Sequence, residues 1–237
     1  MLRRLVNFLL LACFCCASLT AWAATPQPVG AAYKQRYVNL VAAASCLGVY
    51  LPEEGHEFDY LRSFGWEITS QQVTQGKVET NFAVAKNYFP EQKKQFYLVT
   101  FRGSASKKDW MLNLRTERVN YGGATLAEME RIAAQPLDKE QPAVHSGFNS
   151  YVQTVLRTAV IDEKGQWQGV FRDTLSNPEA YLILTGHSLG GAVATLLGER
   201  LVSLGFPKDK FTVVSFGAPA IGNQAFADTY GTSINLV

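Results

Sequence analysis

Cysteine is scarce in this sequence, and most of it is confined to the first residues. Four cysteines occur among 237 residues, and Cys13, Cys15 and Cys16 lie close together near the start. Cys46 stands alone in an apolar, alanine-rich segment, which favours a small buried hydrophobic side chain over a disulfide or redox residue. No cysteine pair has the spacing of a zinc site, and no glycine-rich phosphate loop is present.

An excess of either charge is also lacking. Lysine and arginine number 22 against 20 acidic residues, and the two arginines Arg3 and Arg4 account for the difference. A chain this close to neutrality offers no basic surface for a polyanion. We therefore expect neither nucleic acid nor an anionic surface as a partner.

The first thirty residues have the composition of an export signal. Residues 1–4 are basic, residues 5–19 are almost wholly apolar, and Ala21–Ala23 places small residues two apart. This pattern predicts a signal peptide over residues 1–23 and an exported domain over 24–237. The apolar stretch is short for a retained membrane span. Lipid attachment at Cys13 is an alternative, although this cysteine comes early for it.

Apolar periodicity predicts strands that alternate with helices. Helices are expected over 31–49, 60–65, 126–134, 149–160, 192–204 and 223–230, and strands over 82–88, 95–101, 181–184, 211–216 and from 234 onwards. The first two strands form a hairpin. The alternation predicts an α/β fold with a mostly parallel sheet covered by helices on both faces.

One short turn joins a predicted buried strand to a predicted helix. It reads Gly186-His187-Ser188-Leu189-Gly190, with one serine at the apex and glycines on both sides. Because so sharp a turn leaves no room for flanking side chains, this pattern predicts a nucleophile elbow. The Ser188 hydroxyl would then project above the sheet, with the amides at the N-terminus of the following helix beneath any oxyanion. A plain strand-to-helix turn is the alternative.

Four segments together carry a family resemblance, and they occur along the chain in the order Phe101–Ser104, Val144–Phe148, Gly186–Ala192 and Phe216–Asn223. Together they resemble the fungal-type, or class 3, lipase family of α/β-hydrolases over about residues 80–237. The resemblance implies hydrolysis of lipid or other acyl esters at an oil–water interface, without a metal or organic cofactor. No stable protein partner is expected.

The same resemblance implies roles for particular residues. Ser188 would be the nucleophile, and Ser104 with the Leu189 amide would form the oxyanion hole. A lid helix would lie around residues 107–114. The segment containing His145 would be chiefly structural.

Residues 189–237 contain no histidine, although the hydrolase order places an aspartate and then a histidine after the serine. A serine hydroxyl is a poor nucleophile until a histidine takes its proton. Asp209 and Asp228 are expected to be solvated. The three histidines all precede the nucleophile: His56, His145 and His187. Of these, only His145 is a conceivable substitute base, and a structural role suits it better.

We therefore expect the catalytic aspartate and histidine to lie beyond Val237. The last strands of the sheet would then be absent, leaving an unpaired edge, and the chain as written would be poorly active or inactive. Other functions stay open: a phospholipase, an acyl-polysaccharide esterase, or a catalytically dead binding module that keeps the fold.

Overall fold

The computed structural model describes residues 31–50, 58–75, 78–103 and 117–237. The predicted signal peptide, Cys13, His56, Ser104 and the predicted lid lie outside these residues. The chain divides into two compact units, Met1–Tyr37 and Val38–Val237, and the description below concerns the second. No helix in the described part of the chain combines the length and apolar character needed to cross a bilayer.

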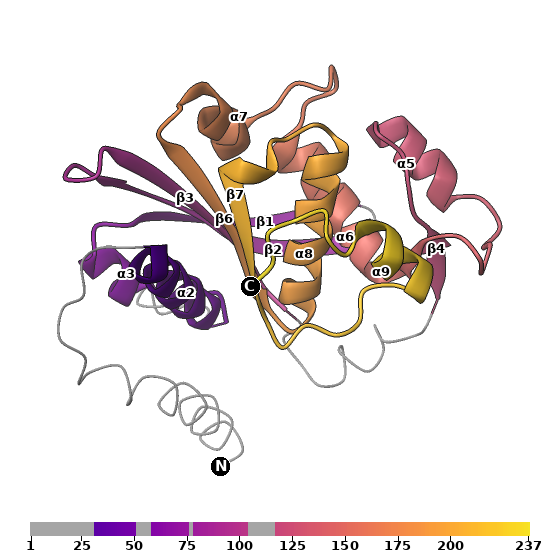
Figure 1. Cartoon of the computed structure of the whole chain (residues 1–237), viewed down its shortest axis with the longest axis horizontal. Coiled ribbons are helices and arrows are strands. Elements are labelled where there is room, and N and C mark those ends of the chain that lie inside the picture. The colour runs from indigo at the N-terminus through magenta and orange to yellow at the C-terminus, as the bar shows by residue number, and fades with distance from the viewer. Residues whose placement is uncertain (1–30, 51–57, 76–77, 104–116) are drawn as a thin grey trace, which may run out of the picture. The chain divides into compact units, whose positions relative to one another are not determined.

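A five-stranded sheet with the order β1-β2-β3-β6-β7 forms the centre of this unit (Figure 1). Its strands are β1 (Glu67–Gln75), β2 (Val78–Phe89), β3 (Lys94–Phe101), β6 (Ala180–His187) and β7 (Phe211–Phe216). The first three strands pair antiparallel, and β3, β6 and β7 pair parallel. Residues 235–237 continue the parallel half beside β7, where the Val213 amide donates to the Asn235 carbonyl at 2.9 Å.

Helices cover both faces of the sheet (Figure 1). The helices in the described part of the chain are α2 (Ala31–Gly48), α3 (Asp59–Ser63), α5 (Leu126–Ala133), α6 (Ser146–Val155), α7 (Gly169–Ser176), α8 (Leu189–Ser203) and α9 (Gln224–Tyr230). A π-helical turn, η1 (Leu156–Val160), follows α6, and a 3₁₀ turn, η2 (Lys208–Lys210), precedes β7. A separate two-stranded sheet forms where β4 (Arg118–Asn120) pairs with β5 (Ala143–His145). On one face, Ser45 and Cys46 of α2 contact Thr100 of β3 and Thr185 of β6. Helices α6 and α8 pack on the other face.

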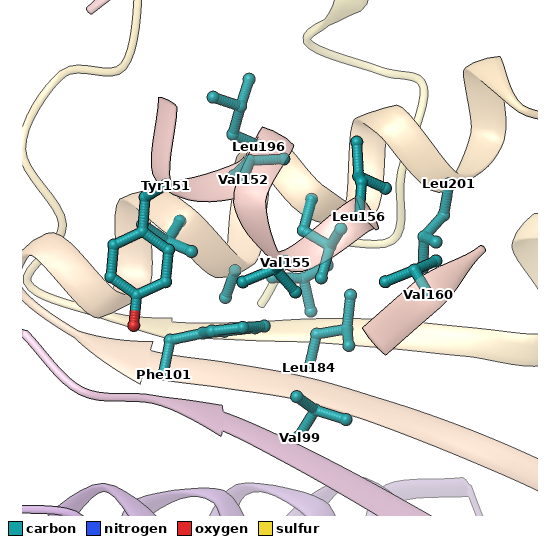
Figure 2. Close-up of a cluster of buried hydrophobic side chains, with 14 of the residues drawn as sticks. Val99, Phe101, Tyr151, Val152, Val155, Leu156, Val160, Leu184, Leu196 and Leu201 are labelled. Atoms are coloured by element: carbon teal, nitrogen blue, oxygen red, sulfur yellow. The ribbon is translucent and has the colours of Figure 1, made fainter. Parts of the chain in front are cut away.

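The side chains between α6, α8 and the sheet form the core (Figure 2). Val99 and Phe101 of β3 and Leu184 of β6 point from one face of the sheet toward Val152 on α6 and Leu196 on α8, and all five are buried. Each fully buried side chain of this size contributes about 1.5–3 kcal/mol. This packing fixes the carboxyl ends of β3 and β6, where Gly103 and Ser188 follow.

Several local features differ from the sequence-based expectation. Strand β1 was not expected, because only Ile68 and Val73 in it are apolar and it lies at the edge of the sheet. Helix α7 was not expected either. The helix expected over 149–160 begins at Ser146 and changes to the π-helical turn at Leu156.

Candidate active site

Ser188 occupies the apex of the turn between β6 and α8. Its backbone has φ 56° and ψ −124°, and its amide donates to the Phe216 carbonyl at 2.9 Å. A positive φ at a residue other than glycine costs about 1–3 kcal/mol and persists only where the surroundings impose it. The side chain is partly exposed. The structure therefore presents this one serine on a strained turn at the N-terminus of a helix of fifteen residues.

Backbone segments meet around this turn without side chains between them. A Cβ atom on Gly186 would lie 2.2 Å from the Gly190 carbonyl carbon. A Cβ atom on Gly190 would lie 2.1 Å from the Phe101 carbonyl oxygen. Because backbone atoms cannot approach a Cβ this closely, both positions require glycine.

The four segments that carry the family resemblance converge here. Phe101 at the end of β3 contacts Gly190, and the Phe216 carbonyl accepts from Ser188. The second and fourth segments are joined where the His145 amide donates to the Ile221 carbonyl at 2.9 Å. The first and fourth segments thus contact the turn that carries Ser188, and the second is hydrogen-bonded to the fourth.

The predicted oxyanion residues, Leu189 and Ser104, follow β6 and β3 respectively. Leu189 begins α8, so its amide has no carbonyl of the same helix to bind. Ser104 lies outside the described residues. Its neighbour Gly103 is buried against the turn, since a Cβ atom there would lie 2.7 Å from the His187 carbonyl oxygen.

His187 directs its ring toward Tyr50 and Gly217. Its Nδ1 lies 3.3 Å from the Tyr50 hydroxyl, and the two rings meet edge to face with their centroids 5.8 Å apart. On the other side, a Cβ atom built on Gly217 would lie 3.9 Å from Nε2. Burial lowers the pKa of this imidazole. Tyr50 is the residue of this site that sequence reasoning missed, and no local pattern marks it.

His145 serves as the N-cap of α6. Its Nδ1 accepts a hydrogen bond from the Gly147 amide at 3.1 Å, and its ring stacks on the Phe148 ring with the two centroids 4.4 Å apart. A ring nitrogen that accepts a hydrogen bond carries no proton, so the neutral ring has its proton on Nε2. A general base needs a free lone pair on the nitrogen that faces the serine. This ring has none, because Nδ1 is engaged and Nε2 is protonated.

Replacing His145 by alanine is expected to lower the free energy of unfolding by about 1–2 kcal/mol. The variant loses both the capping acceptor and the stacked ring. His145→Asn is the control, because asparagine is a good N-cap and should retain roughly half of the lost stability. Urea denaturation of the three proteins measures the difference, and an unchanged midpoint for His145→Ala would contradict the capping role.

The two aspartates that follow Ser188 are both exposed, as expected. Asp209 lies in the 3₁₀ turn between two lysines, and Asp228 on α9 accepts from the Gln224 side chain at 2.7 Å. Neither has the burial or the histidine contact that a catalytic aspartate shows.

Cys46 is buried, as predicted, with Sγ 3.5 Å from the Thr185 hydroxyl. Burial raises its pKa to about 12, so the group is an unreactive thiol. Over the described ranges, no three histidine, cysteine, aspartate or glutamate side chains are grouped so as to hold a metal ion.

Comparison with known proteins connects this geometry to a family. The profile described as lipase (class 3) matches residues 98–237, more than half of the chain. The secreted mono- and diacylglycerol lipase 1 of Fusarium solani is 29% identical over 165 residues, which are 68% of this chain and 41% of that protein. The chloroplastic phospholipase A(1) DAD1 of Arabidopsis thaliana is 32% identical over 133 residues, or 54% of this chain and 28% of that protein. The chain thus spans about two fifths or less of the length of these curated relatives.

Solved structures agree on the fold. The lipase of Rhizopus microsporus var. chinensis superposes with a TM-score of 0.59 at 22% identity, covering 87% of this chain and 65% of that one. The predicted α/β-hydrolase fold is therefore confirmed. The chain belongs to the class 3 lipase family of α/β-hydrolases.

Proposed function

We propose that this chain carries the nucleophile and the oxyanion hole of an exported serine hydrolase that cleaves acyl esters of lipids. The observation that carries the proposal is the backbone of Ser188, held at φ 56° directly before the first turn of α8. Strain of this kind is concentrated at functional sites. Membership of the class 3 lipase family supports the same reaction.

In the proposed reaction, the Ser188 Oγ attacks the ester carbonyl while a base takes its proton. The negative charge that forms on the carbonyl oxygen would be stabilised by the Leu189 amide at the positive end of α8, and by Ser104 on the loop after β3. Collapse of this adduct releases the alcohol, which receives the proton, and leaves an acyl-serine. Water then releases the fatty acid by the same steps.

We propose that the base and its orienting carboxylate come from outside residues 1–237. The Nδ1 of His145 is engaged as a helix cap, and the ring of His187 faces Tyr50 and Gly217. His56 precedes the nucleophile in an order that hydrolases of this fold do not use. Residues 24–237 alone should therefore hydrolyse esters slowly.

The relatives indicate the substrate class. One is named for mono- and diacylglycerols and another as a phospholipase A(1), so the feature they share is an acyl ester of a glycerolipid. We propose this class as the substrate and export as the destination, since the Fusarium relative is named as secreted. The absence of histidine from residues 189–237 favours one competing function, a binding module that holds lipid esters without turnover.

A phosphonate trap tests the proposal. The full reading frame of the gene, without residues 1–23, is treated with a long-chain nitrophenyl phosphonate, and the peptides are analysed by mass spectrometry. We expect one nitrophenolate released per protein and one phosphonyl group on Ser188, with much slower labelling of residues 24–237 alone. Labelling at another residue would contradict the assignment of Ser188, and lipid binding without any labelling would favour the binding module.

A further inference from the structure

Tyr50 lies just after α2 and contacts both loops that frame Ser188. Its hydroxyl donates to the His187 carbonyl at 3.1 Å and lies 3.3 Å from the His187 Nδ1. The same hydroxyl oxygen packs directly against the backbone of Gly103. One side-chain oxygen thus contacts the residue before the proposed nucleophile and the last described residue of the loop after β3.

The contact is close enough to restrict the residue at position 103. A Cβ atom on Gly103 would lie 2.0 Å from the Tyr50 hydroxyl oxygen and 2.7 Å from the His187 carbonyl oxygen. Any larger residue would displace one of these groups. The hydroxyl is therefore held directly between the two backbone segments.

The hydrogen bond of this hydroxyl constrains the tautomer of the His187 ring. A phenol has one proton to donate and two lone pairs that accept. Its proton goes to the His187 carbonyl, and the lone pairs stay available to accept. The His187 Nδ1 lies 3.3 Å from the same oxygen, and because the hydroxyl proton is already engaged, this nitrogen has to carry the proton for the contact to be a hydrogen bond.

The sheet does not hold these loops together by itself. The pairing of β3 with β6 ends at Phe101 and Gly186, so Gly103 and His187 lie past the last position of this ladder, although His187 still pairs with Phe216 of β7. Burial raises the pKa of Tyr50 to about 12, which keeps the hydroxyl protonated as a donor.

We propose that Tyr50 is a positioning residue: its hydroxyl ties the peptide before Ser188 to the loop after β3 and so sets their separation. This inference rests on the proposed role of Ser188 as the nucleophile. Oxyanion donors act only within a few tenths of an ångström of the correct position, and a misplacement of 1 Å can cost about a hundredfold in rate. The link therefore affects the rate of the chemical step more than substrate binding.

Tyr50→Phe removes only the hydroxyl oxygen and is the variant that tests the link. In the full reading frame we expect kcat for ester hydrolysis to fall about tenfold, with KM changed less than about twofold. Tyr181→Phe is the matched control, since Tyr181 lies at the opposite end of β6 from the turn that carries Ser188. An equal effect of the two substitutions, or an unchanged kcat in Tyr50→Phe, would overturn the proposal.

A second measurement tests the contact between Tyr50 and His187 independently of enzyme activity. Residues 1–237 contain three histidines, and ¹⁵N NMR of the full reading frame can follow the His187 ring among them. We expect its neutral form to carry the proton on Nδ1 in the native protein and to lose this preference in Tyr50→Phe. A native ring protonated on Nε2, or a tautomer that the substitution does not change, would show that the hydroxyl does not hold this residue. If Ser188→Ala kept full activity, the nucleophile assignment would fail, while the NMR result would still decide whether Tyr50 holds His187.

Discussion

Ser188→Ala is expected to lower kcat for ester hydrolysis by about 10⁴-fold or more in the full reading frame. The substitution removes the atom that forms the covalent intermediate, and the residual rate would come from binding and oxyanion donors alone. Substrate affinity should change little, because the hydroxyl is one small group at the edge of the acyl site. Initial rates over a range of nitrophenyl ester concentrations separate the two parameters, and a loss smaller than about tenfold would show that another residue is the nucleophile.

Ser188→Gly is the matched control for the backbone. It should lose activity as completely as Ser188→Ala, but its free energy of unfolding should be about 1 kcal/mol higher than that of the alanine variant. Glycine relieves a strain of about 1–3 kcal/mol at φ 56°, and it costs about 0.5–1 kcal/mol in unfolded-state entropy. Equal stabilities of the two variants in urea would show that the turn stores no strain.

The features that sequence reasoning predicted are those encoded locally. The glycines of the turn, the hairpin of β2 and β3 and the end of α2 at Gly48 depend on neighbouring residues or on simple periodicity. The link between Tyr50 and His187 is different, because it joins residues 137 positions apart and depends on where α2 docks. No spacing in the sequence gives that position.

Arg200 shows the same limit in the core. A charged residue near the end of a helix is normally solvated, yet this side chain is fully buried on α8. Its guanidinium lies 3.5 Å over the Tyr121 ring and donates to the Gly122 carbonyl at 2.9 Å. The burial is set by the chain between β4 and α5, and the sequence of the helix alone contains no sign of it.

Gly190→Ala is expected to lower the free energy of unfolding by about 3 kcal/mol or more, or to prevent folding. The added methyl group would lie 2.1 Å from the Phe101 carbonyl oxygen, and overpacking of this kind is most costly where no side chain can move aside. Strand β3 cannot retreat, because it is paired on both sides by β2 and β6. Circular dichroism of the purified variant and its urea midpoint measure the loss.

Gly122→Ala is the control for this substitution. Its nearest neighbour would be the Ile132 side chain at 3.5 Å, an ordinary contact, so its stability should stay within about 0.5 kcal/mol of the native protein. A small effect at Gly122 with a large one at Gly190 would mean that α8 begins in direct backbone contact with the end of β3. The Leu189 amide and the loop after Phe101 can frame one oxyanion only if they are this close. If Gly190→Ala were as stable as the control, the two segments would be too far apart for that role, whatever the activity of Ser188.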